Sequence, residues 1–256
     1  MPIIKLKNYN CNFKFINNHK DKTIIFSNSL GTTYNMWNDV VEIISSEYNI
    51  ILHDTRGHGK STNTKKELTI EELGEDIIEL IGYFNISSLT FCGLSMGGLI
   101  GQYLGINHPD KFNKIIIANT ASKIGNEQGW NDRIDYVSNN GLYSILDGTA
   151  ERWFTTDFRN NHPEIVSEIL NEFKNNDLVG YCANCAAVRD ANFQNEIQKI
   201  KSPTLIISGT DDLVTTIEDG NYMNQKIQNS KHVHLKAAHL SAVELANEFA
   251  SNILNF

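Results

Sequence analysis

The segment Gly93-Leu94-Ser95-Met96-Gly97 carries the clearest chemical signal in the sequence. This G-x-S-x-G pattern places a serine on a sharp turn between a strand and a helix, and the flanking residues favour both elements. We expect the turn to hold Ser95 in a strained backbone conformation that lifts its hydroxyl off the edge of a sheet. The pattern also arises by chance in glycine-rich turns, but the strand before it and the helix after it favour a nucleophile.

A serine hydroxyl becomes a nucleophile only when a base removes its proton, and the base is commonly a histidine oriented by a carboxylate. His239 follows the last predicted strand and opens the last predicted helix. Asp211 and Asp212 follow an earlier strand, and position alone leaves both open as the acid, because turn aspartates are common. The carboxyl ends of parallel strands share one edge, so these side chains can reach Ser95.

The other histidines and the cysteines give weaker signals. His58 is the one rival base, but it precedes Ser95, whereas the order typical of this turn is serine, acid, histidine. His232 and His234 alternate along a strand as a metal pair could, yet no third ligand is near them in the sequence. Cys182 and Cys185 form a C-x-x-C without a second pair, so we interpret them as small core residues.

Backbone amides are expected to complete the chemistry. Acyl transfer builds negative charge on a carbonyl oxygen, and two preorganised N–H groups usually hold it. After a G-x-S-x-G turn, one donor is the residue that follows the serine, here Met96. The second comes from the loop after the third strand, here Leu30, and Gly31 lets that loop turn tightly.

The elements that must position these residues alternate along the chain. Apolar runs predict strands, and helical spacing of apolar residues predicts helices. We expect strands at residues 3–6, 11–15, 23–26, 49–52, 88–92, 114–118, 204–208 and 231–235, and helices at 34–44, 70–84, 96–107 and 240–254. Buried apolar strands separated by helices predict an α/β fold with a mostly parallel, eight-stranded sheet covered on both faces.

The strand signal disappears between residues 120 and 197. Short helical segments are expected there at residues 130–137, 149–154, 163–173 and 178–189. An insertion of this kind between two strands predicts a helical cap, or lid, over the carboxyl ends of the strands. We therefore expect residues 1–121 and 191–256 to form the core and residues 122–190 to form the cap.

Composition narrows the class of protein. The 256 residues include 41% hydrophobic and 20% charged residues, which is ordinary globular usage, and the formal net charge is −8. An acidic surface disfavours nucleic acid and anionic membranes as partners. We find no run of apolar residues long enough for a membrane helix and no signal peptide in the first ten residues, so we expect a cytoplasmic protein with reduced cysteines.

Taken together, these segments resemble the 3-oxoadipate enol-lactonases of the α/β-hydrolase superfamily. The Ser95 motif and residues 56–59 (R-G-H-G) are widespread in that superfamily. Narrower features are the S-L-G loop at residues 29–31, R-W-F at 152–154, and the Y-x-x-x-C-A-A-x-R-D segment at 181–190. In the family the acid is the fourth residue of a G-x-x-D turn, which matches Asp212.

The resemblance implies hydrolysis of a small lactone through an acyl-enzyme on Ser95, with His239 as base, and no metal or organic cofactor. The lactone carries a carboxylate, so a cation should meet it. Arg133 is the first candidate, followed by Arg189 and Arg152, because a guanidinium can bind both carboxylate oxygens. Trp153 and Trp130 are candidates for the pocket wall. Each of these residues could instead have a purely structural role, as an ion-paired arginine or a core tryptophan.

Other functions remain open at this level. A general carboxylesterase, a C–C bond hydrolase or a cofactor-free haloperoxidase could use the same residues, because specificity lies in the pocket under the cap. A ligand-binding protein that has lost turnover is a further alternative, and the intact set of serine, acid and histidine argues against it. The sequence leaves the oligomeric state open.

Overall fold

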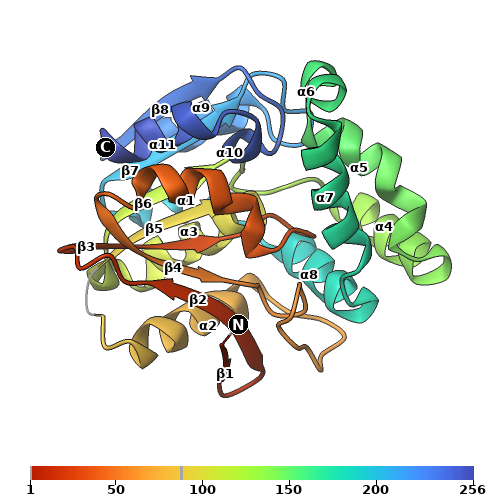
Figure 1. Cartoon of the computed structure of the whole chain (residues 1–256), viewed down its shortest axis with the longest axis horizontal. Helices are drawn as coiled ribbons and strands as arrows, with labels where there is room; N and C mark the ends of the chain where they lie inside the picture. The colour runs from red at the N-terminus through yellow and green to blue at the C-terminus, as the bar shows by residue number, and fades with distance from the viewer. Residues whose placement is uncertain (1, 87–88) are drawn as a thin grey trace.

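The computed structural model describes residues 2–86 and 89–256, and a single eight-stranded sheet runs through these residues (Figure 1). The strands lie in the order β1-β2-β4-β3-β5-β6-β7-β8. β1 pairs antiparallel with β2 and β2 antiparallel with β4, while every other pair is parallel. The strands are β1 (Ile3–Lys5), β2 (Asn10–Ile16), β3 (Lys22–Ser27), β4 (Tyr48–His53), β5 (Leu89–Leu94), β6 (Phe112–Ala118), β7 (Thr204–Gly209) and β8 (Ser230–Leu235). The predicted mostly parallel sheet is confirmed.

Apolar sequence explains why the central strands lie where they do. β4, β5 and β7 are buried along their whole length, as is typical of parallel strands with helices on both faces. α1 packs against α11 and α2 against α3, so the two pairs cover the sheet. The core helices are η1 (Tyr34–Trp37), α1 (Asn38–Ile44), α2 (Ile70–Tyr83), α3 (Met96–Asn107), η2 (Pro109–Lys111), η4 (Ile197–Lys199), α9 (Ile217–Lys226), α10 (Ser241–Glu244) and α11 (Ala246–Leu254).

The chain between β6 and β7 is entirely helical apart from its loops. It contains α4 (Glu127–Asn140), η3 (Leu142–Ile145), α5 (Leu146–Trp153), α6 (Thr156–Asn161), α7 (Pro163–Lys174) and α8 (Leu178–Asp190). These helices gather at one side of the sheet, drawn in green and cyan in Figure 1. Within the group α4 packs against α8. The helical insertion expected from the sequence is therefore present at the expected place in the chain.

The structure departs from the sequence-based expectations in detail. Helices α6 and α9 were not expected; each begins at a threonine whose side chain caps the first turn, Thr155 and Thr216 respectively. The helix expected at 240–254 is interrupted at Leu245, whose φ of −132° separates α10 from α11. The strand expected from Ser88 is described from Leu89 onward, and Ser88 itself lies outside the described residues.

Within the described part of the chain, no helix combines the length and the apolar character needed to cross a bilayer.

Candidate active site

Ser95 lies at the junction of β5 and α3 with a strained backbone. Its φ of 58° and ψ of −111° fall in a region that residues with a side chain rarely occupy. The Thr120 hydroxyl donates to the Ser95 carbonyl oxygen over 2.8 Å and helps to hold the turn. A Cβ atom at Gly93 would lie 2.1 Å from the Gly97 carbonyl oxygen, and one at Gly97 would lie 2.2 Å from a backbone oxygen at the end of β3. Only glycine therefore fits on either side of this turn.

Asp212 and His239 form a buried pair. His239 Nδ1 lies 2.9 Å from Asp212 Oδ2, and both side chains are almost fully buried. Asp212 Oδ1 accepts the backbone N–H groups of Val214 and Thr215, and Oδ2 accepts the Thr215 hydroxyl and Asn119 Nδ2. Burial alone raises the pKa of the Asp212 carboxyl, but attraction to His239 and these hydrogen bonds outweigh burial and lower the pKa to about 2. The carboxylate is thus ionised at neutral pH.

Asn119 is a residue that the sequence-based reasoning missed. It follows β6, has a φ of 43°, and donates from Nδ2 to both Asp212 Oδ2 (3.0 Å) and the Ala238 carbonyl oxygen (3.1 Å). Its Oδ1 accepts the Ser241 hydroxyl over 2.5 Å. Asn119 thereby fixes the acid loop against the histidine loop. A polar residue directly after a buried strand, at the same sheet edge as Ser95, was the signal that could have revealed it.

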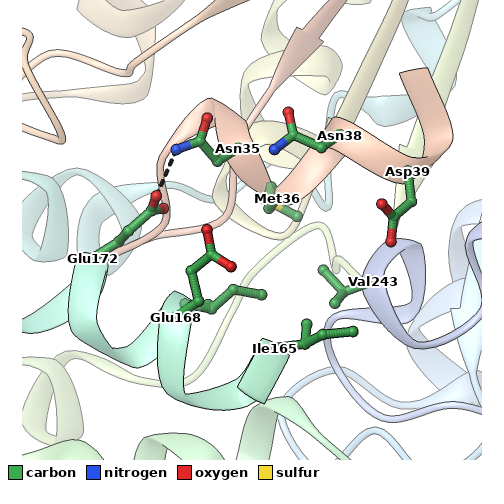
Figure 2. Close-up of a pocket in the computed structure, with 9 residues that line it drawn as sticks. Asn35, Met36, Asn38, Asp39, Ile165, Glu168, Glu172 and Val243 are labelled. Carbon is green, nitrogen blue, oxygen red and sulfur yellow. Dashed lines mark hydrogen bonds between the residues drawn. The ribbon is translucent and has the colours of Figure 1, made fainter. Parts of the chain in front are cut away.

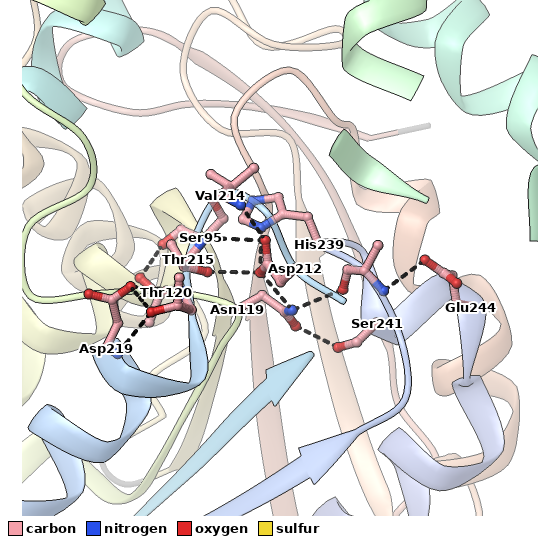
Figure 3. Close-up of polar contacts among 12 residues, drawn as sticks. Ser95, Asn119, Thr120, Asp212, Val214, Thr215, Asp219, His239, Ser241 and Glu244 are labelled. Carbon is pink, nitrogen blue, oxygen red and sulfur yellow. Dashed lines mark hydrogen bonds and ion pairs between the residues drawn. The ribbon is translucent and has the colours of Figure 1, made fainter. Parts of the chain in front are cut away.

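Ser95 and His239 line one cavity of about 60 Å³, and Figure 3 shows both grouped with Asp212. Asp211, the other candidate acid, is exposed, and its carboxylate accepts the Thr210 hydroxyl instead of contacting the histidine. The geometry therefore favours Asp212 as the partner of His239. The remaining residues around this cavity come from the core loops and from the inserted helices: Ser29, Leu30, Ile124, Trp130, Arg133, Arg152, Trp153, Val188 and Val214.

Two backbone N–H groups beside Ser95 are available for an oxyanion. Neither Leu30 nor Met96 donates its N–H to another group in the part of the chain that the structure describes. The N–H groups of the residues that follow them are both occupied: Gly31 donates to a histidine side chain over 2.8 Å, and Gly97 donates to a loop carbonyl over 3.1 Å. The structure thus leaves free the two donors that the sequence pattern indicated.

Two arginines from the inserted helices reach the cavity without a carboxylate partner. Arg133 donates from Nε to the Tyr181 hydroxyl over 2.7 Å, and Arg152 makes one long contact of 3.5 Å with Thr149. Among the described residues neither forms an ion pair with an acid. Burial, and then the positive charge of Arg133, lower the pKa of Arg152. The cavity therefore carries uncompensated positive charge next to Ser95.

The other predicted site residues lie in different places. Trp153 lines the cavity at Ser95. Arg189 does not: its guanidinium pairs with Asp190 (2.7 Å) and Glu67 (3.5 Å) away from the cavity lining, so the structure does not bring it to Ser95. His232 lies beside His234 but contacts Ser208 and Asn221, and no group of three or more metal-type ligands occurs among the described residues.

A second hollow, of about 140 Å³, lies between η1, α1, α7 and α10 and is shown in Figure 2. Its lining contains three carboxylates, those of Asp39, Glu168 and Glu172, and Glu172 accepts a hydrogen bond from Asn35 over 2.5 Å. No basic residue lines it. An anionic substrate is therefore better suited to the cavity at Ser95 than to this hollow.

Comparison with known proteins agrees with this geometry. Residues 22–244 match the family described as alpha/beta hydrolase fold. The chain is 41% identical to 3-oxoadipate enol-lactonase 2 of Acinetobacter baylyi over 226 residues, which cover 88% of this chain and 85% of that protein. The enol-lactonase of Burkholderia xenovorans superposes with a TM-score of 0.97 at 34% identity, over 99% of this chain and 98% of the other. A hydrolase from Pseudomonas aeruginosa superposes with a TM-score of 0.95 at 28% identity, over 99% and 97% of the two chains. The resemblance found in the sequence is confirmed: the chain belongs to the α/β-hydrolase fold family and is a hydrolase homologous to the 3-oxoadipate enol-lactonases.

Proposed function

We propose that this protein hydrolyses 3-oxoadipate enol-lactone to 3-oxoadipate. The observation that carries the proposal is the pair of uncompensated guanidinium groups, Arg133 and Arg152, in the same cavity as Ser95 and His239. Holding two like charges together costs free energy unless an anion neutralises them, and the lactone carries a carboxylate remote from its ring carbonyl. The similarity to proteins named 3-oxoadipate enol-lactonase supports the same substrate.

In this proposal Ser95 is the nucleophile, His239 the general base and Asp212 the group that orients the base. The ionised Asp212 carboxylate accepts a hydrogen bond from His239 Nδ1 over 2.9 Å. That bond selects the tautomer in which Nδ1 carries the proton and Nε2 is free to take the serine proton. The carboxylate also stabilises the imidazolium that forms as Ser95 attacks the ring carbonyl.

The tetrahedral intermediate places negative charge on the former carbonyl oxygen. The free N–H groups of Leu30 and Met96 would bind it, and they need no rearrangement at the moment of attack. Collapse of the intermediate breaks the ring C–O bond and leaves an open-chain acyl-enzyme on Ser95, in which the released enolate stays attached to the acyl chain and takes the proton held by His239. The enol formed in this way ketonises. His239 then activates a water that releases the acid and restores the serine.

Residues 122–190 act as a cap in this scheme, over a core formed by residues 1–121 and 191–256. The cap supplies Trp130 and Arg133 from α4, and Arg152 and Trp153 from α5. The core supplies the reacting serine and histidine. Chemistry and specificity are thus divided between core and cap, and the two arginines select a substrate with a carboxylate.

A direct comparison of substrates tests the proposal. The purified protein is assayed with 3-oxoadipate enol-lactone and with p-nitrophenyl acetate, an uncharged ester. We expect a clearly higher kcat/KM for the lactone. A preference for the neutral ester would instead assign a general carboxylesterase. Failure of a fluorophosphonate probe to label Ser95 would favour a ligand-binding protein without turnover.

A further inference from the structure

His58 makes a buried contact with the loop that carries Leu30. It lies in the loop after β4, is fully buried, and its Nε2 lies 2.8 Å from the backbone nitrogen of Gly31. A backbone N–H can only donate, so Nε2 must accept and therefore carries no proton. The imidazole is held in its neutral form, in keeping with the burial that lowers its pKa to about 4. His58 is thus a hydrogen-bond acceptor for the loop and has no contact with Asp212.

The other polar group of Gly31 is also held. Its carbonyl oxygen accepts a hydrogen bond of 2.7 Å from Nδ2 of Asn176, a buried side chain just beyond the end of α7. Asn176 Oδ1 in turn accepts the N–H of Gly59, the residue after His58, over 2.8 Å. Hydrogen bonds therefore hold the Gly31 backbone to the loop after β4 through its N–H and to the inserted helices through its carbonyl oxygen.

Close packing leaves this loop little freedom. Gly31 has a φ of 90°, and a Cβ atom there would lie 2.5 Å from the ring of Phe173 at the end of α7. The residue directly before Phe173, Glu172, accepts hydrogen bonds of 2.5 Å from both Thr33 and Asn35. The loop that follows Leu30 is therefore docked on α7 through several contacts.

We propose that His58 and Asn176 are positioning residues that clamp Gly31 and so hold the preceding N–H, that of Leu30, where it can bind the oxyanion. The inference rests on the proposed acyl transfer at Ser95. It follows from the hydrogen bonds: the Gly31 N–H donates to His58 and so cannot bind the oxyanion, whereas the Leu30 N–H directly before it has no acceptor among the described residues. The clamp acts on the transition state and leaves substrate binding unchanged, so it should affect kcat far more than KM.

Four variants test the clamp: His58→Leu, His58→Gln, Asn176→Ala and the matched control His53→Leu. His53 is also a fully buried histidine, at the end of β4, and neither of its ring nitrogens has a partner among the described residues. Each variant is first checked for folding by circular dichroism and thermal unfolding. The kcat and KM values are then measured with both the enol-lactone and p-nitrophenyl acetate.

We expect His58→Leu to lower kcat about 10- to 100-fold with KM changed less than about threefold, a smaller loss than removal of a whole oxyanion donor. Asn176→Ala should act in the same direction. His58→Gln should recover much of the activity, since its carbonyl oxygen can accept the Gly31 N–H, and His53→Leu should keep kcat. A folded His58→Leu variant with kcat within twofold of wild type on both substrates would overturn the clamp, as would a loss in His53→Leu equal to that in His58→Leu. Failure of the wild type on the lactone alone would refute the proposed substrate while leaving the clamp testable on the ester.

Discussion

Arg152→Met is the substitution that isolates the role of the positive charge in the cavity. The change keeps most of the side-chain length and removes the guanidinium, whose one side-chain hydrogen bond within residues 2–86 and 89–256 is the 3.5 Å contact to Thr149. Arg133 is less suitable because its Nε donates to the buried Tyr181 hydroxyl over 2.7 Å, so its removal would also break a buried hydrogen bond inside the inserted helices. A loss of activity in Arg152→Met therefore reports on the substrate more directly.

The expected magnitude follows from the chemistry of the contact. A hydrogen bond to a charged group contributes about 1.5–3 kcal/mol, which corresponds to about a 10- to 150-fold loss in kcat/KM for the carboxylate-bearing lactone. An uncharged ester has no such contact, so its kcat/KM should change less than about threefold. Because Arg133 repels Arg152, the free protein should be no less stable without this charge. In Arg152→Met we therefore expect the kcat/KM for the lactone to fall while the stability of the free protein does not.

The assay compares wild type and Arg152→Met on 3-oxoadipate enol-lactone and p-nitrophenyl acetate, with thermal unfolding of both proteins in the absence of substrate. An equal loss on the two substrates would refute the reasoning, because it would show that Arg152 supports the structure of the site and does not bind an anion. A marked fall in the melting temperature of Arg152→Met would likewise indicate a structural role for Arg152.

Three further expectations concern the core of the site. Asp212→Asn should lower kcat about 10⁴-fold without unfolding the protein, as steady-state kinetics and circular dichroism would reveal, because the neutral amide no longer selects the required histidine tautomer. Because the pKa of Asp212 is lowered to about 2, its ionised form stabilises the fold by about 2 kcal/mol above pH 4, and this stabilisation is lost as the pH falls towards 2. Denaturant unfolding at pH 6 and pH 2.5 should therefore show a smaller acid-induced fall in the free energy of unfolding for Asp212→Asn than for wild type. Gly97→Ala would place a methyl group 2.2 Å from a backbone oxygen, so it should lower the free energy of unfolding by more than about 2 kcal/mol and remove most of the activity. The control Gly82→Ala lies at a helical position with open space around it and should leave both the stability and the activity nearly unchanged.

Patterns that depend on local sequence were predictable. The apolar runs of the central strands and the helical spacing of α3 placed Ser95 at a strand-to-helix junction, and the structure has that junction at β5 and α3. Leu30 and Met96 could be proposed as oxyanion donors from the sequence alone, since a donor defined by its position in the backbone needs no knowledge of distant side chains. The helical insertion was also visible, because its residues lack any strand signal.

Contacts between distant segments were not predictable. Asn119 lies 93 positions before Asp212, with which it shares a hydrogen bond, and nothing in the local sequence records that pairing. Arg189 and Arg152 both carry a guanidinium on an inserted helix, but only the folded chain shows that Arg189 is neutralised by Asp190 and Glu67 while Arg152 faces the cavity. The contact of His58 with Gly31 likewise joins two segments 27 positions apart, and no local pattern encodes it.

The most direct test of the whole account is the turnover of 3-oxoadipate enol-lactone by a folded Ser95→Ala variant. We expect its kcat to fall at least about 10⁴-fold below wild type, because the remaining backbone donors and arginines can bind the lactone but cannot form the acyl-enzyme. A Ser95→Ala protein that is folded and still opens the lactone within tenfold of the wild-type rate would contradict the account.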